Sequence, residues 1–213
     1  MFQLDPQSIA NRALASSARI ALPSWGSSVL RGAIGFTAVS VAGFLPWPII
    51  DHWFPSLREM HLYIACTVTF IALSGPCLHG LIIGPGSLSR FYKLFTLAFI
   101  PYVVAWVLLW VSLRDERGVV AGFLGGTAAM GGVFSTAFQA HRALPSVIAA
   151  LFIPNLLGYY AGRLIEGKLI IDHPLVAILL WAICYGIGLG AGLGAAFHLC
   201  QAGAREIIAG REA

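Results

Sequence analysis

The chain has 213 residues, of which 58% are hydrophobic and only 10% are charged, and its mean hydropathy is +0.83. A soluble domain is about 25% charged, so this chain has too little polar surface to cover a water-soluble globule. The composition excludes an ordinary soluble protein and predicts an integral membrane protein. The net charge of +4 implies no nucleic-acid partner, because extra Lys and Arg in the loops of a membrane protein account for it.

Residues 1–30 are predicted to form a cytoplasmic N-terminal segment that contains a short amphipathic helix. Asp5 and Pro6 suit the first turn of such a helix. Arg12 and Arg19 fall on its polar face, and a helix of this kind can lie on an anionic membrane surface. The alternative is a tail that packs on a neighbouring subunit. The segment does not resemble a cleaved signal peptide, because no continuous apolar core follows a basic start.

Six stretches of 19 to 32 residues contain no Asp, Glu, Lys or Arg. Each is long enough for a spanning helix, which needs about 20 apolar residues. The apolar runs are continuous, whereas a transmembrane β-barrel would show alternation. We therefore predict an all-α integral membrane protein with a six-helix domain over 31–201, arranged as three antiparallel hairpins because the loops are short. The predicted helices are roughly 31–50, 60–83, 91–113, 119–140, 146–166 and 174–201.

Lys and Arg are unevenly distributed between the two ends of the predicted bundle. If the N-terminus is cytoplasmic, eight of them lie on the cytoplasmic side and five on the outer side. The positive-inside rule then predicts that both termini, including the tail 202–213, are cytoplasmic, and we expect a bacterial inner membrane. Several tryptophans lie toward the span ends, which suits an aromatic belt. These are Trp47, Trp53, Trp106, Trp110 and Trp181.

Glycines recur at helical spacing in the fourth and sixth predicted spans. Gly186, Gly190 and Gly194 of the sixth repeat every four residues, and the fourth carries Gly122 and Gly126 among others. Rows of small residues let two helix backbones approach closely in lipid. Glycine also costs less there, because water does not compete for the backbone hydrogen bonds. We therefore expect the fourth and sixth spans to pack on each other.

The fifth predicted span carries a polar stripe that begins near the middle of the membrane, one residue after Pro154. Its members are spaced so that they share one helix face. An unsatisfied amide is costly in hydrocarbon, so Asn155 is expected to face protein or water. The alternative is that Asn155 bonds a neighbouring helix and Arg163 extends to the interface. The predicted pathway- or ligand-lining residues are Asn155, Tyr159, Arg163 and Glu166 of this span, together with Gln139 of the fourth predicted span.

Three histidines are predicted near the cytoplasmic ends of separate spans. These are His79, His141 and His198, and Gln201 lies beside the last. Histidines on separate helices can ligate haem or a pigment, bind a metal, or relay protons. The alternative is that each is an interfacial residue that bonds a carbonyl group or headgroup water. We therefore treat the four residues as a candidate cofactor or proton-relay set with no metal assigned.

The favoured function is a channel or transporter for a small solute or ion, with a pathway lined by the fifth span and the glycine-packed fourth and sixth spans. The alternative is an accessory subunit of a larger respiratory or photosynthetic type of membrane complex that holds haem or pigment through histidine. Enzymatic activity is disfavoured, because the interior of the predicted spans holds no acidic residue and no Ser–His–Asp set is evident. The expected partners are the lipid bilayer and either further copies of the chain or other subunits.

Overall fold

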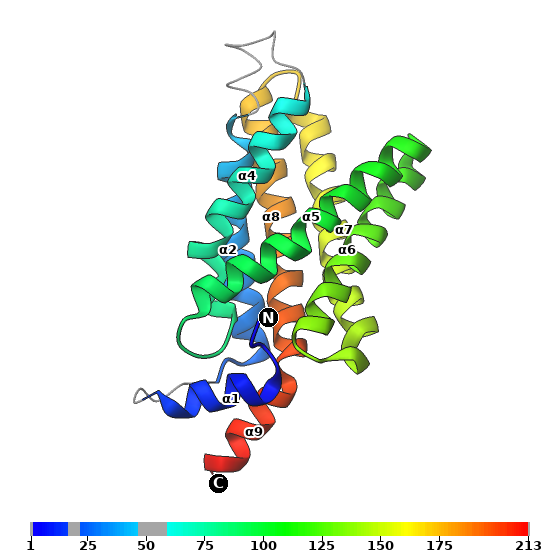
Figure 1. Cartoon of the computed structure of the whole chain (residues 1–213). Coiled ribbons are helices and arrows are strands. Elements are labelled where there is room, and N and C mark those ends of the chain that lie inside the picture. The colour runs from blue at the N-terminus through cyan, green and yellow to red at the C-terminus, as the bar shows by residue number, and fades with distance from the viewer. Residues whose placement is uncertain (1, 17–21, 47–58, 213) are drawn as a thin grey trace.

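The computed structural model describes residues 2–16, 22–46 and 59–212, and within these ranges the chain is helical, with no strand. Six helices in this part of the chain are long and apolar enough to cross a membrane. They form an elongated bundle, and the first and last helices of the chain lie together at one end of it (Figure 1). We call this end the terminal end and the opposite end the distal end.

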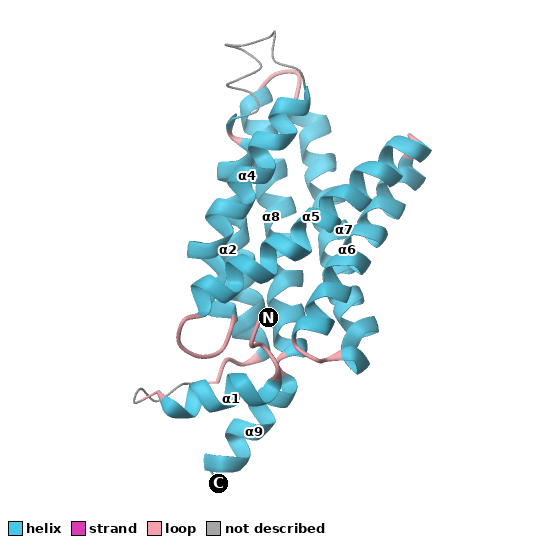
Figure 2. Ribbon diagram, in the orientation of Figure 1, coloured by secondary structure: helices cyan, strands magenta, loops and turns pink. Residues whose placement is uncertain are grey.

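From residue 59 onward the helices follow one another with short connections (Figure 2). Two single 3₁₀ turns, η1 (His79–Leu81) and η2 (His141–Ala143), lie in connections at the terminal end. The membrane-spanning helices are α2 (Trp25–Phe44), α4 (Glu59–Leu78), α5 (Ser87–Leu113), α6 (Glu116–Ala137), α7 (Leu144–Leu169) and α8 (Pro174–Cys200). The shorter helices are α1 (Pro6–Ala15) and α9 (Ala202–Glu212).

The first spanning helix begins at Trp25, six residues before the predicted start of this span at Arg31. The side chain of Ser24 caps it, because its Oγ accepts a hydrogen bond from the backbone N–H of Ser27 at 3.2 Å. Arg31 is exposed on the side of the helix, so its charge does not end the helix. The expected end of this span at residue 50, together with Arg19, Trp47 and Trp53, lies outside the described residues.

The arrangement of the spans places α8 between α2 and α7, and these two contacts are the most extensive in the bundle. α5 and α6 form the third extensive pair, while α4 contacts α2 and α5 less closely. Consecutive spans lie side by side, and α2 meets α8 to close the series. In Figure 1 the distal part of the α5–α6 pair leans away from the other four spans.

Glycines on opposite sides of α8 meet two different helices. Gly186, Gly190 and Gly194 lie against the backbone of α2, where a Cβ added at Gly186 would lie 2.6 Å from the Cα of Thr37. Gly188 and Gly192 lie against α7, where a Cβ at Gly192 would lie 2.8 Å from the carbonyl oxygen of Ala150. No side chain fits at these distances, so α8 approaches both neighbours through bare backbone.

Pro154 explains why one of these contacts can form. Proline has no N–H, so the carbonyl of Ala150, four residues earlier in α7, lacks its usual helical donor. Gly192 of α8 packs against this carbonyl, and Gly188 packs against the carbonyl of Pro154 itself. The freed carbonyl therefore faces the backbone of another helix instead of lipid, where an exposed polar group is costly.

The expectation that the fourth span is the partner of the glycines in the sixth is wrong. Although α6 makes a small contact with α8, its glycines Gly122 and Gly126 face α5, where they receive aromatic side chains. A Cβ at Gly122 would lie 3.0 Å from Cδ1 of Trp106, and one at Gly126 would lie 2.8 Å from Cδ2 of Tyr102. A row of glycines specifies a close approach but does not specify which neighbour fills the space.

The two short helices pack together at the terminal end. Ile9, Ala10 and Ala13 of α1 are buried, and Pro6 lies against Gly203 of α9. The apolar face of α1, which we expected at the membrane surface, is therefore covered by the protein itself. The side chain of Asp5 caps α1 by accepting a hydrogen bond from the N–H of Ser8 at 2.9 Å.

We predict that Gly190→Ala destabilises the protein and that Gly132→Ala does not. The added methyl group at Gly190 would lie 2.8 Å from the Cβ of Phe36, so α2 and α8 must separate, at a cost of about 1–3 kcal/mol. A Cβ at Gly132 of α6 meets no atom within 4 Å. Thermal unfolding in detergent should give a melting temperature several degrees lower for the first variant alone. Equal shifts for both would contradict the proposed role of the close approach.

Candidate functional site

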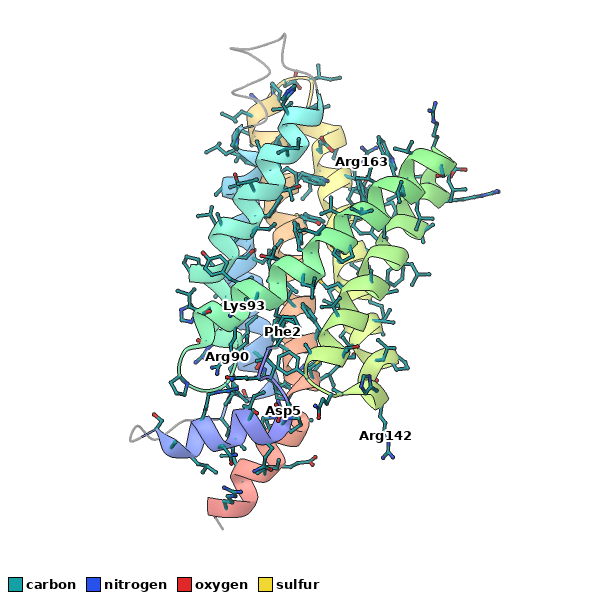
Figure 3. The ribbon with its side chains drawn as sticks, viewed as in Figure 1. Phe2, Asp5, Arg90, Lys93, Arg142 and Arg163 are labelled. Carbon is teal, nitrogen blue, oxygen red and sulfur yellow. The ribbon has the colours of Figure 1, made fainter. Side chains whose placement is uncertain are left out.

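An open cleft of about 820 Å³ lies among α4, α5, α6, α7 and α8. Its charged lining residues lie toward the distal end, where α5 passes into α6 and where α7 approaches its C-terminus. Figure 3 labels one of them, Arg163, in the distal part of the bundle. The charged residues that line the cleft are Arg114, Asp115, Glu116, Arg163 and Glu166.

Aromatic side chains form most of the walls of the cleft. Along one wall, Phe123 of α6 meets Tyr159 of α7 with ring centroids 5.0 Å apart, and Tyr159 meets Trp181 of α8 at 6.0 Å. Trp181 in turn stacks on Tyr185 at 5.3 Å. Rings in these orientations give a continuous, rigid apolar surface with polar edges. Further aromatic lining residues are Phe44, Phe70, Phe99, Tyr102, Trp106 and Trp110.

The base of the cleft holds a buried polar group formed by three helices. Asn155 of α7 is fully buried, and its Nδ2 donates a hydrogen bond to the Oη of Tyr102 of α5 at 2.9 Å. The hydroxyl of Tyr102 also lies 3.3 Å from the hydroxyl of Tyr185 of α8. The Oδ1 of Asn155 has no hydrogen-bond partner among the described residues. A buried acceptor without a donor is costly, and because Asn155 is not among the residues that line the cleft, Tyr102 and Tyr185 are the members of this group that face it.

Two tryptophans that line the cleft have unused hydrogen-bond donors. The indole Nε1 atoms of Trp106 and Trp181 are buried and have no partner in the described part of the chain. Each indole packs on a glycine of a neighbouring helix, since Cβ atoms at Gly122 and Gly162 would lie 3.0 and 2.7 Å from their Cδ1 atoms. The glycines thus make room for both indoles beside the cleft, and both N–H groups are unpaired there.

The residues predicted on the fifth span divide between the lining and the base of the cleft. Tyr159, Arg163 and Glu166 line it, while Asn155 lies behind Tyr102. Arg163 is exposed and Glu166 is half-buried, and the described contacts include no ion pair between them. At the distal rim the hydroxyl of Tyr160 donates a hydrogen bond to Glu116 at 2.9 Å, which connects α7 to α6.

Gln139 does not lie with the other residues of the predicted pathway. α6 ends at Ala137, and Gln139 adopts a left-handed backbone conformation with φ of 55° in the turn that follows. Its side chain is exposed at the terminal end, where it lines a separate cavity beside the N-terminal residues. The predicted fourth span, 119–140, continued through this turn, so the expected helical position of Gln139 is wrong.

Sequence reasoning missed the partners that α5 and α8 contribute to the cleft. Tyr102 and Tyr185 each lie in the middle of an apolar span, and a phenolic hydroxyl at that depth requires a hydrogen-bond partner. The sequence therefore shows that each tyrosine needs a partner. It does not show that Asn155 is the partner of Tyr102, because these two residues are 53 positions apart in the chain and lie on different helices.

The three predicted histidines make separate contacts. The Nδ1 of His79 lies 2.9 Å from the Oγ of Ser87, and His141 is exposed in η2. The Nδ1 of His198 lies 3.4 Å from the Oγ of Ser28. Among the described residues there is no group of three or more His, Cys, Asp or Glu side chains placed to hold a metal ion.

Gln201 joins the end of α8 to the connection after η1. Its Oε1 accepts a hydrogen bond from the N–H of Ile83 at 2.9 Å, and its Nε2 donates to the carbonyls of Leu81 at 2.8 Å and Phe197 at 3.0 Å. The side chain is buried, so these bonds satisfy an amide that would otherwise be costly. This geometry gives Gln201 a structural role at the terminal end.

Comparisons with protein-family models, with curated proteins and with solved structures gave no match for this chain. The assignment of a function therefore depends on the chemistry of the cleft and on its place in the membrane.

We predict that Tyr102→Phe destabilises the protein by about 1–3 kcal/mol, because it removes the acceptor of the buried Asn155 amide. Asn155→Leu should lower the free energy of unfolding less in the Tyr102→Phe variant than in the unaltered protein, since both changes break the same bond. Thermal unfolding of the four proteins in detergent measures this coupling. Strictly additive effects would show that the bond contributes nothing to stability. Tyr159→Phe, at a half-buried tyrosine of α7 whose hydroxyl has no hydrogen-bond partner among the described residues, is the control.

Proposed function

We propose that the protein is a membrane transport protein that admits a small amphipathic solute to the cleft from the distal side. The observation that supports this function is the combination within one cleft of charged rim residues, aromatic walls and a buried hydrogen-bonding base. A site of this kind suits a ligand with an apolar body and a few polar groups. The same arrangement would serve little purpose in a bundle that only anchors other proteins.

The unpaired atoms around the cleft favour a particular polar chemistry in the solute. The indole N–H groups of Trp106 and Trp181, which are both lining residues, require hydrogen-bond acceptors, and the acidic lining residues offer acceptors to a donor. A solute that carries both an acceptor and a donor, such as an alcohol, an amide or a zwitterion, would match this lining. Its apolar part would lie against the rings of Tyr159 and Trp181.

The route beyond the base is closed by phenylalanines. Phe197 of α8 packs on Phe134 of α6 and on Phe91 of α5, with centroids 4.9 and 5.8 Å apart. Phe138 meets Phe197 at 5.8 Å, and all four of these rings are buried. We propose that this aromatic layer separates the cleft from the terminal side, so that the described conformation is open to the distal side only.

Opening the layer requires one group of helices to move against another. α5 and α6 contact each other extensively but contact the other spans less, whereas α8 is held between α2 and α7 by close backbone contacts. We propose that the α5–α6 pair rocks against the fixed α2–α8–α7 unit, as in alternating access. No Asp or Glu lies in the middle of a span, which favours passage down the gradient of the solute over coupling to a carboxylate-bound ion.

The basic residues also support a proposal for the orientation. Described Lys and Arg side chains are more numerous at the terminal end than at the distal end, so we propose that both termini are cytoplasmic in a bacterial inner membrane. Solute would then enter the cleft from outside the cytoplasm.

The alternative role, as an accessory subunit of a larger complex with haem or pigment, makes a different prediction for the extracted protein. A coloured or hetero-oligomeric particle in mild detergent would favour that role, and a colourless homo-oligomer would favour transport.

We predict that Asn155→Leu lowers solute uptake at least tenfold and that His141→Ala changes it less than twofold. The first change removes a buried hydrogen-bonding group, worth about 1–3 kcal/mol, whereas His141 is exposed in η2 at the terminal end and does not line the cleft. Swelling of proteoliposomes in iso-osmotic urea, glycerol, glycine or phenylalanine measures uptake. Equal effects of the two variants, or no uptake of any solute above that of empty liposomes, would contradict the transport proposal.

A further inference from the structure

Two arginines come together where α1 lies against the connection that precedes α5, at the terminal end. Arg12 donates hydrogen bonds to the Oε1 of Gln3 at 3.2 Å and to the backbone carbonyl of Gln3. Arg90 donates to the carbonyl of Gly84 at 3.4 Å and to that of Pro85. Each guanidinium has five N–H donors, so both retain donors after these bonds. The two side chains meet at Gly84, since Arg90 bonds its carbonyl and a Cβ at Gly84 would lie 3.9 Å from the Cβ of Arg12.

This cluster is short of negative charge. Burial lowers the pKa of the Arg12 guanidinium. The carboxylate of Asp5 raises the pKa, but by less than burial lowers it. Asp5 is itself used to cap α1, where hydrogen bonds from Ser8 lower the pKa of its carboxyl group. Neither arginine forms an ion pair with a described carboxylate. Two adjacent like charges at a membrane interface favour binding of an anion.

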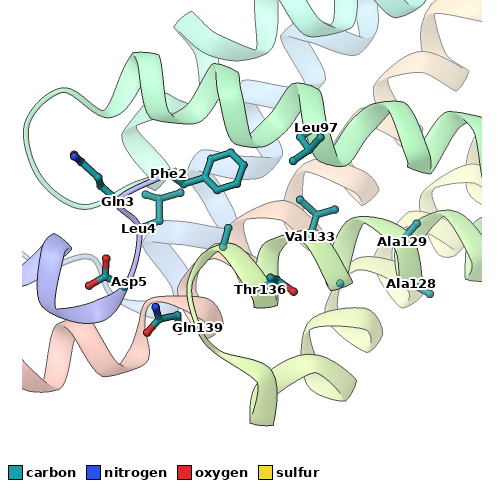
Figure 4. A pocket seen from close by; sticks show the side chains of 12 residues that line it. Phe2, Gln3, Leu4, Asp5, Leu97, Ala128, Ala129, Val133, Thr136 and Gln139 are labelled. Carbon is teal, nitrogen blue, oxygen red and sulfur yellow. The ribbon is translucent and has the colours of Figure 1, made fainter.

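Two apolar grooves adjoin the cluster on the outside of α5. Phe2 lies between them, and Phe2 and Leu97 line both. One groove, of about 590 Å³, runs between α5 and α6 past Val133 (Figure 4). The other, of about 450 Å³, runs along α5 past Lys93 and Ile100. Figure 3 shows the labelled side chains of Phe2, Arg90 and Lys93 in the same region of the bundle.

The spacing of these residues along α5 matches the depth of a phospholipid. Arg90, Lys93, Leu97 and Ile100 share one helix face. At 1.5 Å per residue, Leu97 and Ile100 lie about 10 and 15 Å deeper than Arg90 along the helix axis. The positive charges therefore lie at the level of headgroups while the grooves lie at the level of acyl chains.

We propose that an anionic phospholipid binds here, with its phosphate at Arg12, Arg90 and Lys93 and its two acyl chains in the grooves on either side of Phe2. The N-terminal residues contribute both a charge and the wedge between the chains. Bound lipid would therefore hold α1 and the residues before it against the start of α5. This site is separate from the distal cleft and does not depend on transport.

Native mass spectrometry of the full-length protein in mild detergent tests the site directly. The protein is titrated with dioleoyl-phosphatidylglycerol and, as the neutral comparison, with dioleoyl-phosphatidylcholine. We expect a preference of at least tenfold for the anionic lipid, and a loss of at least tenfold in its affinity in the Arg12→Gln and Arg90→Gln double variant. Arg142→Gln, at an exposed arginine of η2 at the same end, should bind the lipid as the unaltered protein does. No preference for the anionic lipid, or an equal loss in Arg142→Gln, would overturn the proposal.

Two further variants make the test independent of the folding of the double variant. Lys93→Gln changes an exposed side chain and should weaken phosphatidylglycerol binding at least threefold. Leu97→Trp fills both grooves and should weaken lipid binding at least tenfold while leaving the binding of inorganic phosphate unchanged. If inorganic phosphate binds as tightly as phosphatidylglycerol, the grooves hold no acyl chains and the lipid assignment is wrong. If neither variant changes lipid binding, the site is elsewhere.

Discussion

The backbone of α8 approaches α2 on one side and α7 on the other more closely than any side chain would allow. Five alternating glycines from Gly186 to Gly194 make this possible, because three of them face α2 and two face α7. In lipid there is no hydrophobic force between helices, so close packing of this kind is a principal source of association. The contact holds α2, α8 and α7 as one unit and fixes the positions of Asn155 and Tyr185 at the base of the cleft.

The cleft follows from the contrast between this unit and the α5–α6 pair. Glycines of α6 receive Trp106 and Tyr102 of α5, so these two helices hold each other while their contacts with the remaining spans are less extensive. The distal part of the pair leans outward, and aromatic side chains line the cleft there without closing it. The bond between Tyr102 and Asn155 joins the two units at the base. It is therefore a structural connection, and under the proposed function Tyr102, which lines the cleft, is the member of the pair that a solute would meet.

The sequence predicted the elements well, because membrane thickness sets the length of an uncharged span and charges limit its ends. It placed the start of α2 too late, since Arg31 lies exposed on the helix face. Within the site, helical spacing put Tyr159, Arg163 and Glu166 on one face of one helix. It could not predict the pairing of Tyr102 with Asn155 or the place of Trp181 in the cleft wall, because contacts between helices leave no periodic pattern. Gln139 was assigned to the pathway because the expected helix was extended past Ala137, where the chain turns.

If the cleft admits solute as proposed, water enters it to the depth of Tyr102, between helices that otherwise face lipid. Cysteine labelling at two adjacent positions of α5 tests it, since Val103 lines the cleft and Val104 faces outward with 51% of its surface exposed. Val103→Cys and Val104→Cys are each made in a variant without the four native cysteines and treated, in membranes, with a charged, membrane-impermeant methanethiosulfonate. We expect the cysteine at 103 to react with the reagent. The cysteine at 104 is covered by hydrocarbon and should not react. Equal reactivity at both positions, or reaction at 104 alone, would contradict this expectation.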